Sequence, residues 1–315
     1  MKKISLIGAG GIGGELASLI ALNSFGNIRL IDIDEGIAKG KALDLIQSFS
    51  VKNKCVDIKG SSNLSEIRDS DVIIVTAGIS RKPGMTRDDL IGTNAKIIEK
   101  IGLAIKEFSE NAFVICITNP LDAMVWVLKQ TSGLKKNMVV GMAGILDSLR
   151  FKYFLSKELN ICFNSINAMV LGGHGDTMVP LLNYVSINGI PITEFINNGL
   201  INEERLEYVI KKTRNGGGEI VSLLKTGSAF YSPAVSALEM MESFLFDQKK
   251  LLACSAYLEG EYDVNDYCVG VPVVIGSKGI EKIIELEFKQ NDKTEFDKSA
   301  YAVKEITEKC KKLLV

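Results

Sequence analysis

The chain lacks a strong net charge, a cysteine cluster and a long apolar run, and each absence excludes a class of protein. Its 37 lysines and arginines nearly balance its 38 aspartates and glutamates, so the net charge gives no sign of a basic surface for nucleic acid and we expect no nucleic-acid partner. No apolar run approaches the roughly 18 residues of a membrane span, so we expect no membrane association. The six cysteines include no C-x-x-C pair, and we therefore expect no metal.

The remaining composition is that of an ordinary globular protein. The chain has 315 residues, of which 46% are hydrophobic and 24% charged, enough for two domains with buried cores. The apolar N-terminal segment is interrupted by glycines and by Glu15, so it forms no signal-peptide core. Together with the scattered cysteines, this predicts a cytoplasmic protein with reduced, mostly buried thiols.

Histidine occurs only once, as His174 in residues 172–177 (GGHGDT). Histidine is the side chain whose ordinary pKa of about 6.5 allows proton exchange near neutral pH. Its small and turn-forming neighbours predict a loop on which the imidazole reaches a ligand. On the motif alone, a hydrogen-bonded surface histidine is an equally good interpretation.

A nucleotide-binding pattern opens the chain. The apolar run Ile4–Ile7 precedes residues 8–13 (GAGGIG), and leucines and isoleucines then recur at helical spacing. Asp32 ends a second strand-like run, 19 residues after Gly13. Strand, G-x-G-x-x-G turn, helix and acidic residue together predict a Rossmann dinucleotide site.

Each part of this pattern has a physical task. Gly8 permits the tight turn, Gly10 allows the backbone to approach a pyrophosphate, and Gly13 allows the helix to pack closely on the strand. Asp32 would bind the adenosine ribose hydroxyls and repel a 2′-phosphate, which favours NAD over NADP. Asp34 lies close enough to compete for that role, and a glycine-rich turn without a ligand is the alternative for the whole pattern.

The first half of the chain, residues 1–145, is predicted to be the NAD-binding Rossmann domain. Strand-like runs at 56–59, 71–76 and 113–118 alternate with amphipathic stretches at 37–49, 89–108 and 121–130, which predicts an α/β fold with a doubly wound parallel sheet. Ligands bind at the carboxyl ends of such strands. The residues expected at the cofactor are Gly8, Ala9, Gly10, Gly11, Ile12, Gly13, Asp32, Asn94, Ile117, Thr118 and Asn119.

The second half, residues 146–315, is predicted to be an α+β substrate domain with antiparallel strands. Short strand-like runs occur at 167–171, 184–187, 251–258 and 268–274, and long helical patterns at 203–224 and 296–313. The polar residues 289–295 are expected to form a surface turn.

Arginine is rare, with seven residues among 37 basic ones. Because its planar fork holds carboxylates bidentately, each position is informative. Arg81 and Arg87 share a loop after a predicted strand, where a lid over a substrate would be hinged. Asp147 and Arg150 share one face of a predicted helix, where the aspartate could orient the histidine and the arginine could hold a carboxylate. A surface salt bridge is the alternative.

Four motifs together resemble the lactate and malate dehydrogenase superfamily, and within it the lactate-dehydrogenase-like malate dehydrogenases of bacteria. They are residues 81–90 (RKPGMTRDDL), 118–122 (TNPLD), 147–150 (DSLR) and 172–176 (GGHGD). The resemblance implies that His174 exchanges a proton with the substrate oxygen and that Asp147 holds its imidazole. It implies further that Arg150 grips a carboxylate, that Arg87 polarises the carbonyl, and that Asn119 contacts the same oxygen and the nicotinamide ribose.

The resemblance also implies an activity, the NAD-dependent interconversion of (S)-malate and oxaloacetate in the tricarboxylic acid cycle. Arg81 determines this expectation, because the lactate enzymes typically carry a neutral glutamine there, and pyruvate would leave the cation unpaired. Ser80 departs from the proline common before this arginine, without removing the charge. A homo-dimer or homo-tetramer is expected. The alternatives are a lactate or other 2-hydroxyacid dehydrogenase, and a catalytically silent dinucleotide sensor.

Overall fold

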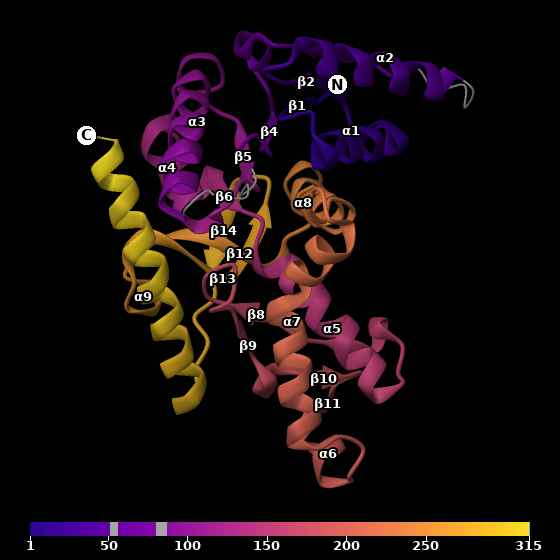
Figure 1. Cartoon of the computed structure of the whole chain (residues 1–315), viewed down its shortest axis with the longest axis vertical. Helices are drawn as coiled ribbons and strands as arrows, with labels where there is room; N and C mark the ends of the chain where they lie inside the picture. The colour runs from indigo at the N-terminus through magenta and orange to yellow at the C-terminus, as the bar shows by residue number, and fades with distance from the viewer. Residues whose placement is uncertain (51–55, 80–86, 315) are drawn as a thin grey trace.

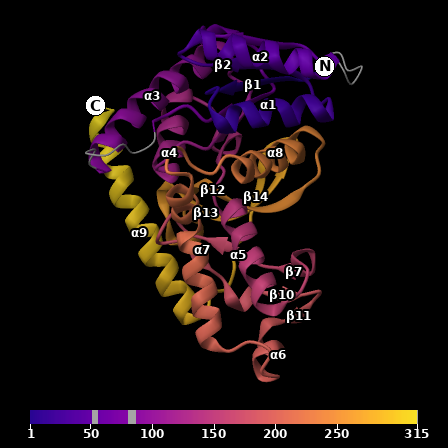
Figure 2. The same cartoon turned by 45° about the vertical axis from the view of Figure 1, so that its right-hand side comes forward.

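The computed structural model describes residues 1–50, 56–79 and 87–314, with the side chain of Arg87 left out. The predictions for Arg81, for Ser80 and for the side chain of Arg87 therefore fall outside the described residues. Figures 1 and 2 show an upper part that carries the N-terminal half and a lower part formed by the middle of the chain. Among the described residues, no helix is long and apolar enough to cross a membrane.

The described residues form one large sheet in the order β14-β13-β12-β6-β5-β4-β1-β2-β3. Six of its strands run parallel, and β4 and β5 are buried along their whole length, as expected of apolar strands covered on both faces. The parallel strands are β1 (Lys3–Ile7), β2 (Asn27–Ile31), β3 (Ile58–Ser61), β4 (Val72–Val75), β5 (Phe113–Cys116) and β6 (Val139–Gly141). The helices among them are α1 (Gly11–Asn23), α2 (Glu35–Ser50), α3 (Arg87–Phe108) and α4 (Leu121–Ser132).

The second half extends the same sheet and adds two small ones. Strand β12 (Lys250–Glu259) pairs antiparallel with β6, and β13 (Asn265–Gly276) and β14 (Gly279–Ile283) follow antiparallel. The small sheets contain β7 (Ile166–Asn167), β10 (Ser186–Ile187) and β11 (Ile190–Pro191), and β8 (Val170–Leu171) with β9 (Val179–Pro180). The helices are α5 (Gly144–Leu159), α6 (Ile192–Asn197), α7 (Glu203–Leu224), α8 (Tyr231–Leu245) and α9 (Gln290–Leu313). Single 3-10 turns lie at Leu64–Ile67, Lys136–Met138, Phe163–Ser165, Leu182–Tyr184 and Glu261–Asp263.

The predicted α/β fold class is confirmed, with local corrections. The prediction of a surface turn at 289–295 was wrong, because α9 begins at Gln290; its first turns are polar since they face solvent. The run 167–171 is divided between β7 and β8. The short strand β6 escaped prediction, since three residues carry no usable period.

Two apolar clusters support the site. The larger one surrounds the large sheet and the helices on it, and the smaller one lies around α5 and α7, with Phe151, Leu155, Leu206 and Val209 buried in it. Helix α9 packs against α3, α4 and β13, and it runs along one side of the molecule in both views (Figures 1 and 2). The loop that carries His174 is hydrogen-bonded to α4, α9 and β13.

Candidate active site

The glycine loop between β1 and α1 has the geometry that its sequence predicts. Gly8 has φ +110°, and a Cβ on it would collide with the Thr76 hydroxyl. A Cβ on Gly13 would overlap the Gly8 carbonyl oxygen. A Cβ on Gly10 would meet no atom within 4 Å. Gly8 and Gly13 are thus required by the fold, whereas Gly10 faces open space in which a ligand can approach the backbone.

The N-terminus of α1 is open toward this space. Gly10 caps the helix without a side-chain hydrogen bond, and the first turn contains no acidic residue. The Lys41 Nζ donates to the Gly10 carbonyl at 2.8 Å, which adds a positive charge beside the loop. Unbonded N–H groups and the positive end of the helix dipole suit a pyrophosphate.

Asp32 and Asp34, which the sequence left in competition, have different surroundings. The Asp32 carboxylate accepts hydrogen bonds from the Ala9 N–H at 2.7 Å and the Asp34 N–H at 3.0 Å. Asp34 accepts from the Ile37 N–H at 3.1 Å and so holds the first turn of α2. Asp32 is therefore the carboxylate that lies against the glycine loop.

Three polar residues predicted at the cofactor lie near the carboxyl ends of β4 and β5. Asn94 is 1% exposed, and its amide bonds the Ile79 N–H and the carbonyls of Ile79 and Asn119. The Thr118 hydroxyl donates to the Ala77 carbonyl. Asn119 is exposed at the end of the run. Asn94 and Thr118 thus fix the backbone, whereas Asn119 is exposed and Ile117 is buried.

His174, Asp147 and Arg150 form one connected cluster. The His174 Nδ1 lies 2.8 Å from Asp147 Oδ2, and Arg150 donates to Asp147 Oδ1 at 3.3 Å. The side chains of the three are 16%, 2% and 15% exposed. The interpretation of Asp147 and Arg150 as a surface salt bridge therefore does not apply, because the carboxylate is buried and shared.

The surroundings of His174 favour its charged form. Burial lowers the pKa of the imidazole, but the charge and hydrogen bond of Asp147 and the charge of Asp122 outweigh both burial and the opposing charge of Arg150, so the pKa lies above its ordinary value. Since Nδ1 is bonded to Asp147, Nε2 is the ring nitrogen left to exchange a proton.

The loop of His174 is held by residues to which the sequence assigned no role. Gly172 and Gly270 of β13 exchange backbone hydrogen bonds, and the Gly173 N–H donates to the Ser299 hydroxyl of α9 at 2.8 Å. The His174 N–H donates to Asp122 Oδ2 at 2.9 Å. Asp122 belongs to the 118–122 motif, but Ser299 lies in no motif; no local pattern marks a serine that bonds a backbone 126 residues away.

Three glycines, residues 216–218, lie within α7, and two of them, Gly216 and Gly217, make room for Arg150. A Cβ on Gly216 would stand 3.3 Å from Arg150 Cδ, and one on Gly217 would stand 3.6 Å from both terminal nitrogens of Arg150. The neighbouring Arg214 instead donates to the Met178 carbonyl at 3.0 Å. Gly216 and Gly217 thus lie against the guanidinium that we propose to bind substrate.

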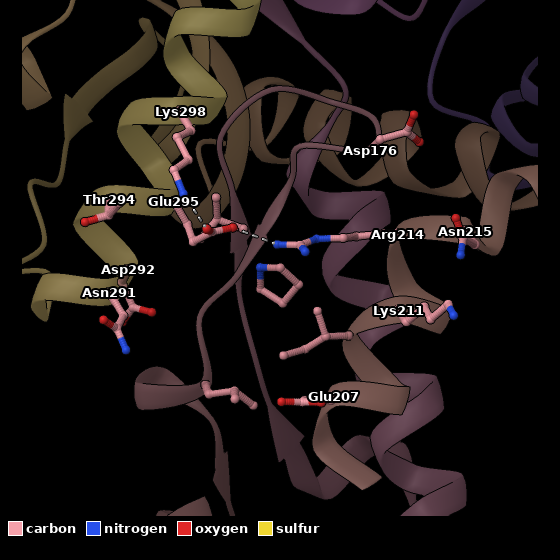
Figure 3. A pocket seen from close by; sticks show the side chains of 14 residues that line it. Asp176, Glu207, Lys211, Arg214, Asn215, Asn291, Asp292, Thr294, Glu295 and Lys298 are labelled. Atoms are coloured by element: carbon pink, nitrogen blue, oxygen red, sulfur yellow. Dashed lines mark hydrogen bonds and ion pairs between the residues drawn. The ribbon is translucent and has the colours of Figure 1, made fainter. Parts of the chain in front are cut away.

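Two cavities lie near the histidine loop. One, of about 310 Å³, is lined by residues 173–177, by Pro120–Ala123 and by α9. The other is a groove of about 860 Å³ between α7 and α9, in which Arg214 extends toward Glu295 (Figure 3). Asp147, Arg150 and His174 do not line the larger groove. In the part of the chain that the structure describes, no group of three His, Cys, Asp or Glu residues could hold a metal ion.

The open glycine loop at the end of a parallel sheet and the buried carboxylate–imidazole pair define the class of a dinucleotide-dependent oxidoreductase. The chain belongs to the lactate/malate dehydrogenase family: residues 2–141 match the NAD binding domain and residues 145–314 match the alpha/beta C-terminal domain. The protein is therefore an NAD-dependent oxidoreductase of this family.

Solved structures of the family include enzymes for both substrates. The chain is similar to malate dehydrogenase from Cryptosporidium parvum, with 47% identity, 99% of each chain covered and a TM-score of 0.95. It is also similar to lactate dehydrogenase from Eimeria maxima with NADH and oxamate, with 44% identity, 99% and 95% coverage and a TM-score of 0.96. Malate dehydrogenase from Picrophilus torridus matches with 42% identity, 99% and 98% coverage and a TM-score of 0.94.

Proposed function

We propose that the protein catalyses the reversible NAD-dependent oxidation of (S)-malate to oxaloacetate, as in the tricarboxylic acid cycle. The observation that carries the chemistry is the hydrogen-bonded cluster of His174, Asp147 and Arg150. It combines a proton donor, a buried anion that stabilises the imidazolium, and a guanidinium beside both. Reduction of a 2-oxo acid needs these three properties.

In the direction of reduction, oxaloacetate gains a hydride at C2 and a proton at the carbonyl oxygen. Bound NADH supplies the hydride. The His174 Nε2 gives the proton and leaves a neutral imidazole, and Asp147 keeps the ring oriented throughout. Arg150 holds the carboxylate next to C2, Asn119 contacts the carbonyl oxygen, and Arg87 polarises it. In oxidation, His174 takes the proton back.

The cofactor fits the residues at the glycine loop. The α1 N-terminus would hold the pyrophosphate, with Gly10 leaving the necessary space. Asp32 would hold the adenosine ribose, and its negative charge disfavours the 2′-phosphate of NADP. Asn94 and Thr118 contribute through the backbone that they fix, since their polar groups bond protein atoms.

The choice of malate over lactate rests on Arg81. The solved neighbours include enzymes named for each substrate, so overall similarity does not decide between them. An arginine at this loop position would pair with the second carboxylate of oxaloacetate, whereas pyruvate offers only a methyl group. An unpaired buried cation costs several kcal/mol, about a hundredfold or more in selectivity.

The decisive experiment is a paired assay of oxaloacetate and pyruvate, each with NADH and with NADPH. We expect kcat/KM to be highest for oxaloacetate with NADH. Faster NADH oxidation with pyruvate at equal concentration would refute the assignment of Arg81. No turnover with any 2-oxo acid, combined with tight NADH binding, would identify a silent dinucleotide sensor instead.

The variant Arg81→Gln sharpens this assay. It removes the charge but keeps a shorter polar side chain, so we expect the preference for oxaloacetate to fall at least tenfold as pyruvate becomes acceptable. Lys82→Gln serves as the matched control, because it removes a neighbouring charge to which we assign no substrate contact. Equal losses in both variants would indicate a general electrostatic effect of the loop.

We further propose a cytoplasmic homo-dimer or homo-tetramer. Apolar side chains are exposed on α2 and α8, namely Ile37, Leu43, Ile46, Tyr231 and Val235. Such apolar exposure on two helices suits subunit contacts. Sedimentation equilibrium measures the assembly, and a monomer at micromolar concentration would contradict it.

A further inference from the structure

Asp122 is a buried carboxylate that the reaction described above does not use. It lies in the first turn of α4 and is 5% exposed. Both of its oxygens accept hydrogen bonds: Oδ1 from the Ser255 hydroxyl of β12 at 2.7 Å, and Oδ2 from the His174 N–H at 2.9 Å. Two acceptors on one buried group are what an ionised carboxylate provides.

Among the described residues, Asp122 forms no ion pair with a lysine or an arginine. Lys309 lines the same cavity but is paired with Asp88. The thiol of Cys116 is the nearest titratable group on β5, and burial raises its pKa to about 12, so it stays neutral. Burial likewise raises the pKa of the Cys268 thiol on β13. Burial raises the pKa of the Asp122 carboxyl, whereas the hydrogen bonds from Ser255 and from the His174 N–H and the charge of the imidazole act in the opposite direction. The imidazole of His174 is therefore the charge to which Asp122 couples.

We propose that Asp122 is a positioning residue that anchors the backbone of His174 and stabilises the protonated imidazole by its negative charge. The two aspartates have different roles. Asp147 orients the ring through Nδ1, and Asp122 holds the main chain of His174. This inference rests on the proposed function only in that the protonated imidazole is the acid of the reaction.

The geometry favours an electrostatic role in addition to a structural one. In a buried setting a charge a few ångströms away acts with little screening, whereas an exposed charge is screened by water and salt. The other charged groups that face the histidine from its loop and the packed helices are Asp147, Arg150, Asp176, Glu305 and Lys309. Of these, Lys309 is already paired with Asp88 at 2.6 Å, and Asp176 and Glu305 are exposed.

The single histidine allows a direct test, because ¹³C-labelled histidine gives one imidazole signal in this chain. The midpoint of its pH titration is measured in the free protein and in the variants Asp122→Asn, Asp147→Asn and Glu305→Gln. Asp122→Asn keeps an oxygen that accepts the His174 N–H but removes the charge. We expect it to move the midpoint to lower pH, by less than Asp147→Asn does. Glu305→Gln, the matched exposed control, should leave the midpoint in place.

A midpoint unchanged in folded Asp122→Asn would overturn the proposal. The anchoring is tested by hydrogen exchange of the His174 amide, which should remain protected in Asp122→Asn and exchange faster in Asp122→Ala; equal rates would contradict it. If neither variant folds, the test uses the wild-type protein, in which the chemical shifts of the aspartate carboxyl carbons are followed against pH. The shifts of two carboxyl carbons, those of Asp122 and Asp147, should change at the pH of the imidazole midpoint. A change in only one carbon would refute the role of Asp122.

These measurements use neither malate nor NADH, so they separate the two proposals. A shifted midpoint in a protein without turnover would refute the proposed activity and support Asp122. Turnover with an unshifted midpoint would do the reverse. In an active enzyme, kcat/KM for oxaloacetate should fall at a lower pH in Asp122→Asn than in the wild type. A purely structural defect would not change this pH.

Discussion

The cofactor end and the histidine end of this site are built in opposite ways. At the proposed cofactor end, glycines leave the backbone accessible: Gly10 faces open space, and the start of α1 has no side-chain cap. At the histidine end, side chains from several elements hold one loop: Asp122, Asp147 and Ser299 all bond residues 173–174.

This difference reflects what each end has to do. A dinucleotide is held by many backbone contacts, so one strand, turn and helix that are adjacent in sequence suffice. Proton transfer needs one nitrogen fixed within a fraction of an ångström and kept at a suitable pKa. That requirement is met only by partners brought together by the whole fold.

The largest expected effect comes from replacing His174 with asparagine. This change removes the proton donor but leaves the glycine loop untouched, so we expect kcat to fall by about two to four orders of magnitude while NADH binding stays within about twofold of wild type. Steady-state kinetics and fluorescence titration of NADH measure the two. Retained turnover would refute the mechanism, and loss of NADH binding would show that the two ends are not independent.

The variants Gly10→Ala and Gly13→Ala change the glycine loop and leave the histidine end intact. A methyl group on Gly10 meets no protein atom, so it should weaken NADH binding at least tenfold with little change in stability. A methyl group on Gly13 would overlap the Gly8 carbonyl oxygen, so it should lower the free energy of unfolding by about 1–3 kcal/mol or more. Calorimetry and NADH titration test both. Equal affinity losses at equal stability would mean that Gly10 does not face the cofactor.

The pH dependence measures the histidine end alone. Because the pKa of His174 is raised, kcat/KM for oxaloacetate should be constant at low pH and fall as pH rises through a value above about 6.5. For malate, kcat/KM should rise through the same value, since oxidation needs the neutral imidazole. Rate profiles in both directions provide the measurement. A midpoint below 6.5 would show that burial outweighs the carboxylates.

More of the cofactor end than of the histidine end could be predicted from the sequence. Gly8, Gly13 and Asp32 could be recognised because their tasks depend on neighbours within one strand–turn–helix unit. His174 was recognised by its rarity, and Asp147 through a motif. Asp122 and Ser299 were missed as anchors, because hydrogen bonds across 52 and 126 residues leave no periodic trace. The polar start of α9 was mistaken for a turn for a related reason, since exposure of a helix end resembles a loop in composition.

The smallest expected effect compares Gly216 with Gly218, which lie in the same helix and differ in whether Arg150 lies against them. Alanine in place of an exposed glycine inside a helix stabilises by roughly 1 kcal/mol, and a Cβ on Gly218 meets nothing within 4 Å. Gly218→Ala should therefore gain about that amount with KM unchanged. A Cβ on Gly216 presses on Arg150 at 3.3 Å, so Gly216→Ala should gain less and raise KM for oxaloacetate several-fold.

Thermal unfolding and steady-state kinetics of the two variants give both quantities. Equal stabilisation with equal KM would mean that the room beside Arg150 has no part in substrate binding, and that the glycines of α7 serve the fold alone. A raised KM confined to Gly216→Ala would instead show that even a regular helix of the second half is shaped around one side chain. The histidine end would then depend on distant elements for its space as well as for its hydrogen bonds.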